Sequence, residues 1–209
     1  YPSKQFMKKA IVLVTTLFAA FQLGYAQSFY DIGSVQTIEI TFPFSNWDYQ
    51  LDTAIAGSEG YIIATSCTIN GEVFDSVGVK YKGNSSYSAN NAKNPFHIEL
   101  NTVKGGQDYQ GYTDVKLGNG FSDPSFVREP LSYEILRNYM DAPLSNFAKV
   151  YVNGSYIGLY TSAENIGKQF AADHFYSNDN TFFKCNPAFG AGPGSMGASD
   201  LRYLGASVS

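Results

Sequence analysis

Residues 77–100, VGVKYKGNSSYSANNAKNPFHIEL, predict two β-strands joined by a polar loop. In VGVKYK, apolar side chains alternate with glycine and lysine, which is the periodicity of a half-buried strand. The following GNSSYSANNAKNP is dense in small, polar and turn-forming residues, so we expect a loop there. The alternation returns in PFHIEL, where the apolar residues share one face. The stretch therefore favours a sheet at the centre of the fold.

Two lysines make this stretch a candidate anion site. Lys80 and Lys82 share the polar face of the first strand, and Gly83, Ser85 and Ser86 follow at once. Backbone N–H groups and hydroxyls beside fixed positive charge are the groups that bind a polyanion such as a triphosphate. The alternative is an exposed hairpin with a solvated basic edge, because Gly-Asn-Ser-Ser alone is no nucleotide fingerprint.

Alternating segments on both sides of this stretch predict a largely antiparallel sheet. Asn-Gly pairs, the strongest short hairpin signal, occur at residues 70–71 and 153–154. A short helix capped by Asn46 is expected, and so is a helix at residues 166–175 that turns its phenylalanines inward. Further strands are expected at residues 37–42, 61–71, 114–119, 148–152, 156–164 and 180–187.

One long helix is expected to interrupt the sheet. Residues 122–125, Ser-Asp-Pro-Ser, place a capping side chain before a proline, and SFVREPLSYEILRNYM continues as the helix. Pro130 would then cost a hydrogen bond or kink the helix. The predicted apolar face contains Phe126, Leu131, Ile135 and Met140. The predicted fold class is α+β, a largely antiparallel sheet with one long helix.

The N-terminal segment has the pattern of a secretory signal peptide. A basic start at Met7-Lys8-Lys9 precedes the apolar run of residues 10–23, and small residues at 24 and 26 precede Gln27. We therefore predict a signal peptide over residues 1–26, with residues 1–6 upstream of the true start, and no stable membrane span after cleavage. The alternative is an uncleaved membrane anchor.

Composition places the rest of the chain among ordinary globular domains. The 209 residues are 44% hydrophobic and 15% charged, with a formal net charge of −4. This acidic balance argues against non-specific nucleic-acid binding. Of the two cysteines, Cys67 lies in a predicted strand, so a disulfide with Cys185 and a buried free thiol both remain open. Neither cysteine has zinc-ligand spacing, and no G-x-S-x-G motif supports a hydrolase.

Several segments together resemble one family. VGVKYKGNSSY, NPFHIEL, SDPSFVRE, NGSYIGLY and TFFKCNP follow one another as they do in the CotH family, the spore-coat-H-type secreted kinases that are atypical relatives of protein kinases. The likeness covers residues 37–187. It implies that residues 27–209 form a kinase-like N-lobe and hinge, truncated before a C-lobe.

The resemblance also implies a nucleotide site that uses ATP and Mg²⁺. One lysine of the first strand would neutralise phosphate charge, the loop after it would offer donors, and the long helix would order that lysine through an ion pair. The adenine-side linker would end at Glu164. The implied nucleotide-binding residues are Lys80, Lys82, Gly83, Asn84, Ser85, Ser86, Arg128, Glu129 and Glu164.

The function implied is ATP-dependent phosphoryl transfer to Ser or Thr of a surface protein, by a secreted or cell-surface enzyme when full length. The aspartates for catalysis and Mg²⁺ are expected beyond Ser209, so this fragment is expected to be inactive alone and to bind ATP weakly. His97 and Glu99 depart from the family's pattern, which puts a phosphate role for their strand in doubt. The alternative is a non-catalytic secreted module that binds a protein or glycan.

Overall fold

The computed structural model describes residues 28–57, 60–83, 85–176, 183–185 and 201–203. The predicted signal peptide and Asn84 lie outside these residues. The strands are β1 (Val35–Thr41), β2 (Ile62–Ile69), β3 (Glu72–Tyr81), β4 (Phe96–Glu99), β5 (Asp114–Gly118), β6 (Ser145–Val152), β7 (Ser155–Ala163), β8 (Phe183–Cys185) and β9 (Leu201–Tyr203). The helices are α2 (Trp47–Ala56), α3 (Arg128–Leu136) and α4 (Lys168–Phe175).

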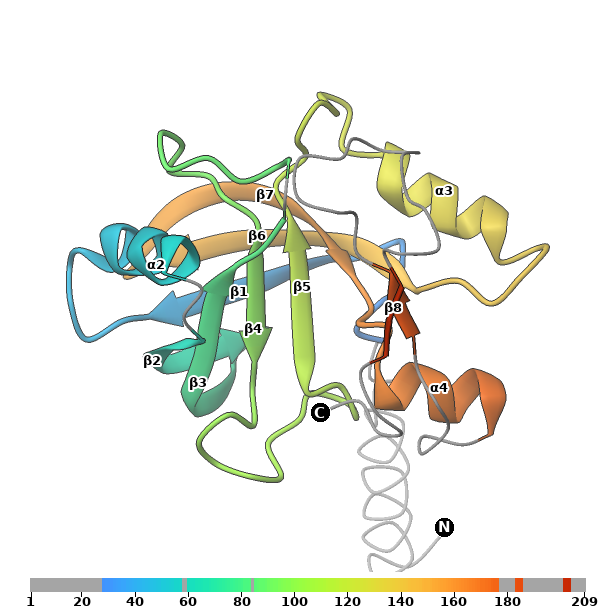
Figure 1. The fold of residues 1–209 in the computed structure, drawn as a ribbon, viewed down its shortest axis with the longest axis horizontal. Coiled ribbons are helices and arrows are strands. Elements are labelled where there is room, and N and C mark those ends of the chain that lie inside the picture. Colours follow the sequence, from blue (N-terminus) through green and yellow to red (C-terminus); the bar gives the residue numbers. More distant parts are fainter. Residues whose placement is uncertain (1–27, 58–59, 84, 177–182, 186–200, 204–209) are drawn as a thin grey trace, which may run out of the picture.

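Seven strands close into a barrel (Figure 1) in the order β1-β2-β3-β4-β5-β7-β6. Every neighbouring pair is antiparallel except β1 and β6, which run parallel from Val35 opposite Phe147 to Ile40 opposite Val152. This parallel pair joins the first and sixth strands and closes the barrel. The strands β8 and β9 form a separate two-stranded sheet.

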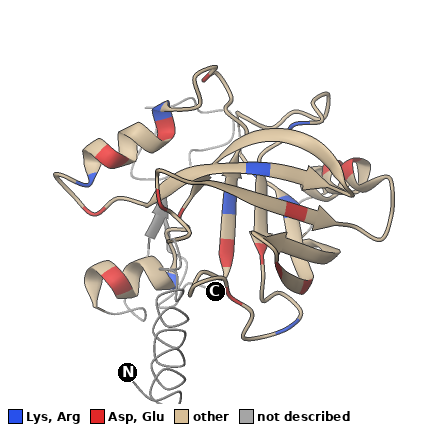
Figure 2. Ribbon diagram, turned by 180° about the vertical axis from the view of Figure 1, so that it is seen from behind, with Lys and Arg blue, Asp and Glu red and all other residues tan. Residues whose placement is uncertain are grey.

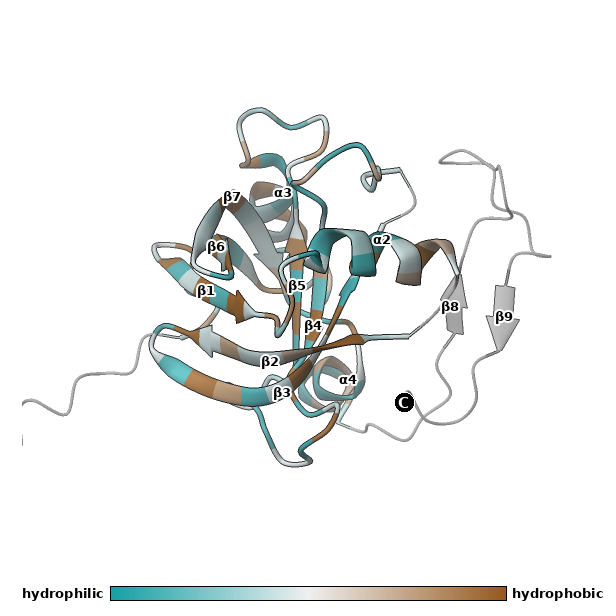
Figure 3. Cartoon of the chain, turned by 90° about the vertical axis from the view of Figure 1, so that its left-hand side faces the viewer, coloured by the Kyte–Doolittle hydropathy of each residue, from teal (hydrophilic) through white to brown (hydrophobic). Residues whose placement is uncertain are grey.

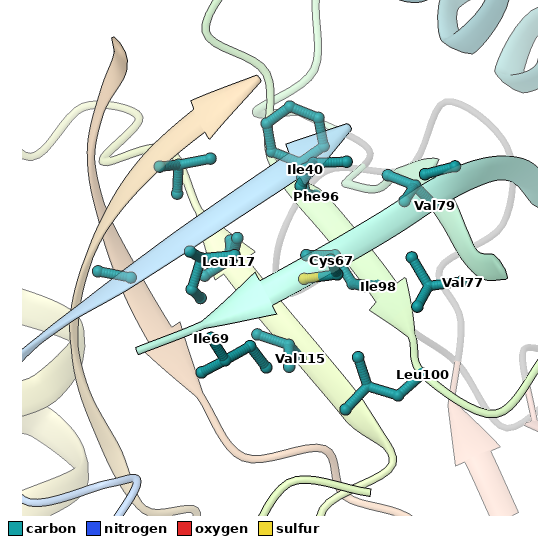
Figure 4. Packing of buried hydrophobic residues seen from close by; sticks show 14 of the residues in the cluster. Ile40, Cys67, Ile69, Val77, Val79, Phe96, Ile98, Leu100, Val115 and Leu117 are labelled. Atoms are coloured by element: carbon teal, nitrogen blue, oxygen red, sulfur yellow. The ribbon is translucent and has the colours of Figure 1, made fainter. Parts of the chain in front are cut away.

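The barrel interior is the hydrophobic core. Hydrophobic and hydrophilic residues alternate along the strands (Figure 3), because successive side chains point to opposite faces. The inward side chains meet across the barrel (Figure 4), with Cys67 among them. Cys67 is a free thiol, and burial raises its pKa to about 12. Of the two states left open for this cysteine, the structure has the buried free thiol.

The predicted fold class, an α+β sheet with one long helix resembling a kinase N-lobe, is wrong. The structure is a closed barrel, and the part that it describes has three short helices. Periodicity identified the strands, but it carries no information on the pairing of β1 with β6, which lie far apart in the sequence. Helices cover the outside only in places: α2 packs against β2 and β3, and α3 against β6 and β7 (Figure 1).

The predicted long helix is shorter because Pro130 belongs to its first turn. The helix α3 begins at Arg128, and its first backbone hydrogen bond runs from Leu131 N–H to Val127 O. The N–H groups of a first turn have no partner within the helix, so proline costs nothing at this position. The predicted apolar face is also wrong, because Leu131 and Ile135 are more than half exposed.

Local turn signals were more reliable than cap signals. Both Asn-Gly hairpins are confirmed, between β2 and β3 and between β6 and β7. Asn46 precedes α2 as predicted, but its side chain makes no capping hydrogen bond. In α4, Phe170 is buried as predicted, whereas Phe175 is exposed. Among the described residues, no helix has the length and apolar character needed to cross a bilayer.

Candidate functional site

Polar side chains of β3, β4 and β5, together with Thr161 of β7, lie on the outer face of the barrel, opposite the core. Strand register aligns Lys80 with His97 and His97 with Lys116. In the same way Gly118 of β5 lies beside Thr161 of β7. Figure 2 shows that acidic and basic residues are interspersed over the strands and helices, so the site is defined by individual contacts and not by one large charged surface.

Lys82 is a half-buried lysine of this face. It follows β3 directly, and its N–H donates to Pro95 O at 3.0 Å. Burial lowers the pKa of its ammonium group, and the negative charge of Glu129 opposes that shift. No carboxylate of the described residues forms an ion pair with it. Lys82 is therefore a half-buried cation with an acidic neighbour, Glu129, and with no direct salt bridge to the residues that the structure describes.

Glu129 reaches this face from the first turn of α3. Its carboxylate accepts a hydrogen bond from Thr161 Oγ1 at 2.5 Å. Gly118 leaves room for this contact, since a Cβ added there would lie 3.0 Å from Glu129 Oε2 and 2.5 Å from Thr161 Oγ1. The hydrogen bond to Thr161 orients the acid beside the end of β5.

Asp123 determines where α3 begins. Its carboxylate accepts hydrogen bonds from the N–H groups of Ser125 and Arg128, as a capping side chain does. The Arg128 side chain turns toward the loop before the helix, where it donates to Ser122 O at 2.9 Å, and it is mostly exposed. Of the two helix residues implied by the resemblance, the structure brings Glu129 and not Arg128 toward Lys82.

Lys80 belongs to a different cluster of side chains. Its Nζ lies 4.1 Å from the centre of the Tyr61 ring. The Tyr61 hydroxyl is 3.3 Å from His97 Nδ1, and His97 Nε2 is 2.6 Å from Asp114 Oδ1. Burial lowers the pKa of His97. The sequence signal for this cluster was the polar face shared by the residues of β4 and β5, but periodicity did not reveal that Tyr61 would cover it.

The loop between β3 and β4 is tied to the barrel by side-chain amides. Asn119 Nδ2 donates to Ser86 O at 2.9 Å and to Lys93 O at 3.0 Å. Gly83 has a positive φ of 96°, and Ser86 Oγ occupies the space where a Cβ on Gly83 would lie. Ser85 is exposed. The loop is therefore held against the end of β5, with Ser85 open to solvent.

Glu164 lies apart from these residues, after the end of β7. It is buried, its carboxylate accepts a hydrogen bond from Leu144 N–H at 3.1 Å, and its own N–H donates to Leu144 O. Burial raises its pKa. The structure gives Glu164 a contact with the chain before β6 and does not bring it to Lys82.

Glu164→Gln is expected to raise the free energy of unfolding at neutral pH. The folded pKa of Glu164 is above its unfolded value, so its stabilising contribution is present at low pH and is lost as pH rises through the folded pKa. Glutamine keeps an acceptor for Leu144 N–H without the buried charge. Urea denaturation should show an advantage for the variant at neutral pH that shrinks in acid.

The exposed Glu39→Gln on β1 is the control for this charge removal. A Glu164→Gln variant less stable than wild type at neutral pH would contradict the expected sign.

The residues around Lys82 fit phosphate better than they fit a metal. An ammonium group with hydroxyls and backbone N–H groups nearby is a phosphate-binding set. Among the described residues, no group of three or more His, Cys, Asp and Glu could hold a metal ion. The described residues therefore give no Mg²⁺ ligand, and we derive no step through Mg²⁺.

Gly118→Ala is expected to lower the free energy of unfolding by about 1–3 kcal/mol, the usual cost of overpacking. The new methyl group would collide with Thr161 Oγ1 and Glu129 Oε2, which hold α3 on the sheet. Gly105→Ala is the matched control, because nothing lies within 4 Å of a Cβ added there. If chemical denaturation gave both variants the same free energy of unfolding, the Glu129 side chain would be able to move away from the new methyl group.

The sequence matches one known protein family. Residues 79–202 match the family model described as CotH kinase protein. The chain belongs to the CotH kinase protein family. This confirms the resemblance carried by the sequence motifs. No curated protein matches the chain.

The CotH match contains Lys82 and the residues around it, whereas Tyr61 lies before the matched range. It begins within β3, just before Lys80, and it covers the loop with Ser86, the end of β5 and the Glu129–Thr161 contact. The strands β1 and β2 precede it. Sequence reasoning missed Gly118, Asn119 and Thr161, because a small residue, an amide and a hydroxyl at strand ends give no signal of their own.

Proposed function

We propose that this CotH kinase family protein binds the phosphates of ATP beside Lys82 and belongs to a secreted enzyme that phosphorylates Ser or Thr of a surface protein. The observation that carries the proposal is the half-buried Lys82, whose pKa the nearby Glu129 carboxylate influences without forming a salt bridge among the described residues. Such a cation is costly to bury unless a charged ligand compensates it.

The proposed role of Lys82 is to neutralise phosphate charge. In protein kinases, a strand lysine contacts the phosphates and a helix glutamate pairs with it. Glu129 is a helix glutamate whose charge acts on Lys82 without a direct ion pair, and its hydrogen bond from Thr161 holds its carboxylate in place. ATP supplies the phosphoryl group, while the chain's own residues bind and orient it. Phosphoryl transfer depends mainly on such positioning and charge stabilisation.

Secretion is part of the proposal and rests on the N-terminal sequence. A basic start followed by an apolar run and small residues is the pattern of a signal peptide. An exported kinase would act on hydroxyl groups of proteins at the cell surface.

The test is calorimetric titration of the protein with ATP, adenosine and inorganic tripolyphosphate. ATP and tripolyphosphate are expected to bind and adenosine to bind much more weakly, because the proposed binding group, the Lys82 ammonium, would contact phosphate. Equal affinity for ATP and adenosine, or no heat with ATP at millimolar concentration, would overturn the phosphate site. Transfer of labelled γ-phosphate to a surface-protein fraction then tests the enzymatic part.

A second candidate is a secreted module that binds a partner protein and transfers nothing. The helix α3 favours it, because large apolar side chains on or just after the helix are exposed: Leu131, Ile135, Leu136, Tyr139 and Met140. Exposed apolar patches often mark interaction surfaces. Lys82→Met separates the two functions, since it should remove ATP binding and leave partner binding intact.

A further inference from the structure

We infer that Lys93, at the far end of the loop after β3, is a second phosphate-binding cation that makes the site selective for nucleoside di- and triphosphates over monophosphates. The inference rests on the proposed phosphate site at Lys82 and deepens it. Lys93 was not among the residues implied by the sequence.

The ammonium group of Lys93 lies on aromatic rings. Its Nζ is 4.3 Å from the centre of the Phe126 ring and 5.2 Å from that of Tyr160. Its stem runs along Gly158, where an added Cβ would be 3.0 Å from Lys93 Cε. The side chain is partly exposed, so a ligand can reach it from solvent. Burial lowers its pKa.

Lys93 has no anionic partner in the part of the chain that the structure describes. The ion pairs there leave it out, in contrast to Lys104, which pairs with Asp75. Aromatic faces attract a cation but carry no net charge. A phosphate group would supply the missing counter-charge and would form a charge-assisted hydrogen bond.

The backbone holds Lys93 close to the Lys82 site. Asn119 bonds both Lys93 O and Ser86 O, and it directly follows the glycine that Glu129 approaches. The N–H of Lys82 is bonded to Pro95 O, two residues beyond Lys93. The two lysines thus stand at opposite ends of one loop whose ends are joined.

The Phe126 ring that contacts Lys93 belongs to a residue with a strained backbone conformation. Phe126 has a φ of +59°, in the left-handed region that bulky residues rarely occupy. Its ring lies over Gly120, where an added Cβ would come within 2.5 Å of the ring. Strain of this kind persists only where the surroundings enforce it, and it is concentrated at functional sites.

Two cations at the ends of one loop can contact different phosphate groups of one ligand. A monophosphate can occupy only one of them, so it gains nothing from the second. Removal of Lys93 should therefore weaken binding of ATP and ADP and leave AMP unaffected. A purely structural role would change the affinity for all three nucleotides together.

The experiment is titration of wild type, Lys93→Met and Lys93→Arg with ATP, ADP and AMP. We expect Lys93→Met to lose about tenfold in ATP affinity, equivalent to about 1.4 kcal/mol, with AMP affinity unchanged. Lys93→Arg should keep most of the ATP affinity, since its charge remains. Lys149→Met, which removes an exposed lysine on β6, is the matched control.

The outcomes separate the inference from the proposal on which it rests. Absence of ATP binding in wild type overturns both. ATP binding that needs Lys82 but is unchanged in Lys93→Met overturns the inference alone, and so does an equal loss for ATP and AMP. If Lys93→Met does not fold, acetylation of the wild-type protein gives the answer. ATP but not AMP should slow modification of Lys93, and equal modification rates contradict the inference.

Discussion

Lys82→Met is expected to abolish measurable ATP binding and to leave the protein as stable as wild type or more stable. Methionine fills much of the volume of the lysine stem without its charge. The lysine is half-buried and lacks a salt bridge among the described residues, and burial lowers its pKa, so its charge opposes folding. A residue kept for function at the expense of stability gives this pair of results.

The contribution of Lys82 to stability depends on pH with a definite sign. The folded pKa of Lys82 is below its unfolded value. Its stabilising contribution is therefore present only above the unfolded pKa and is lost as pH falls through the folded pKa. At neutral pH the folded protein bears the cost of the charged ammonium group. The free energy of unfolding of Lys82→Met, measured by urea denaturation, should therefore match or exceed that of wild type. The control is Lys149→Met, on the exposed surface of β6, which should change neither ATP binding nor the free energy of unfolding. A marked loss of stability in Lys82→Met with ATP binding retained would mean that Lys82 is structural.

Phe96→Ala is expected to be the most destabilising single change, at about 3–5 kcal/mol. The ring is fully buried at the end of the barrel, and its centroid lies 5.2 Å from Tyr81, 5.7 Å from Tyr160 and 6.3 Å from Trp47. It therefore joins β3, β4, β7 and α2. Removing it leaves a cavity that four rigid elements cannot fill by small movements.

Chemical denaturation measures the effect of Phe96→Ala. The control is Phe121→Ala, which removes the same ring from a position that is 57% exposed, where we expect a change below about 0.5 kcal/mol. A loss of less than about 1 kcal/mol in Phe96→Ala would show that the aromatic cluster can collapse onto the vacant space.

The parts of the fold that could be predicted from the sequence are those determined locally. At the two Asn-Gly turns, asparagine has φ of 51° or 47° and the following glycine has 91° or 78°. These left-handed angles suit only a few residue types, so the hairpins could be read from the sequence. The strands were recognisable for a similar reason, because each has one face in the core.

The missed features depend on contacts between distant segments. The pairing of Val35 with Phe147 closes the barrel, and no periodicity within either strand specifies its partner. For the candidate site, local reasoning pointed to Lys80 and Lys82, and the resemblance drew attention to Glu129. The hydrogen bond of Glu129 to Thr161 and the aromatic contacts of Lys93 form only after β5, β7 and the loops have been assembled.

The parallel pairing of β1 with β6 also determines the order in which the molecule can be built. A ribosome releases β1 early, together with its hairpin partners, yet the strand that completes its other edge is made more than a hundred residues later. Until then β1 offers unpaired backbone groups to any passing strand. Closing such a long loop before its contacts form slows folding. Folding should therefore be limited by the arrival of β6, and a chain cut before Val152 should aggregate.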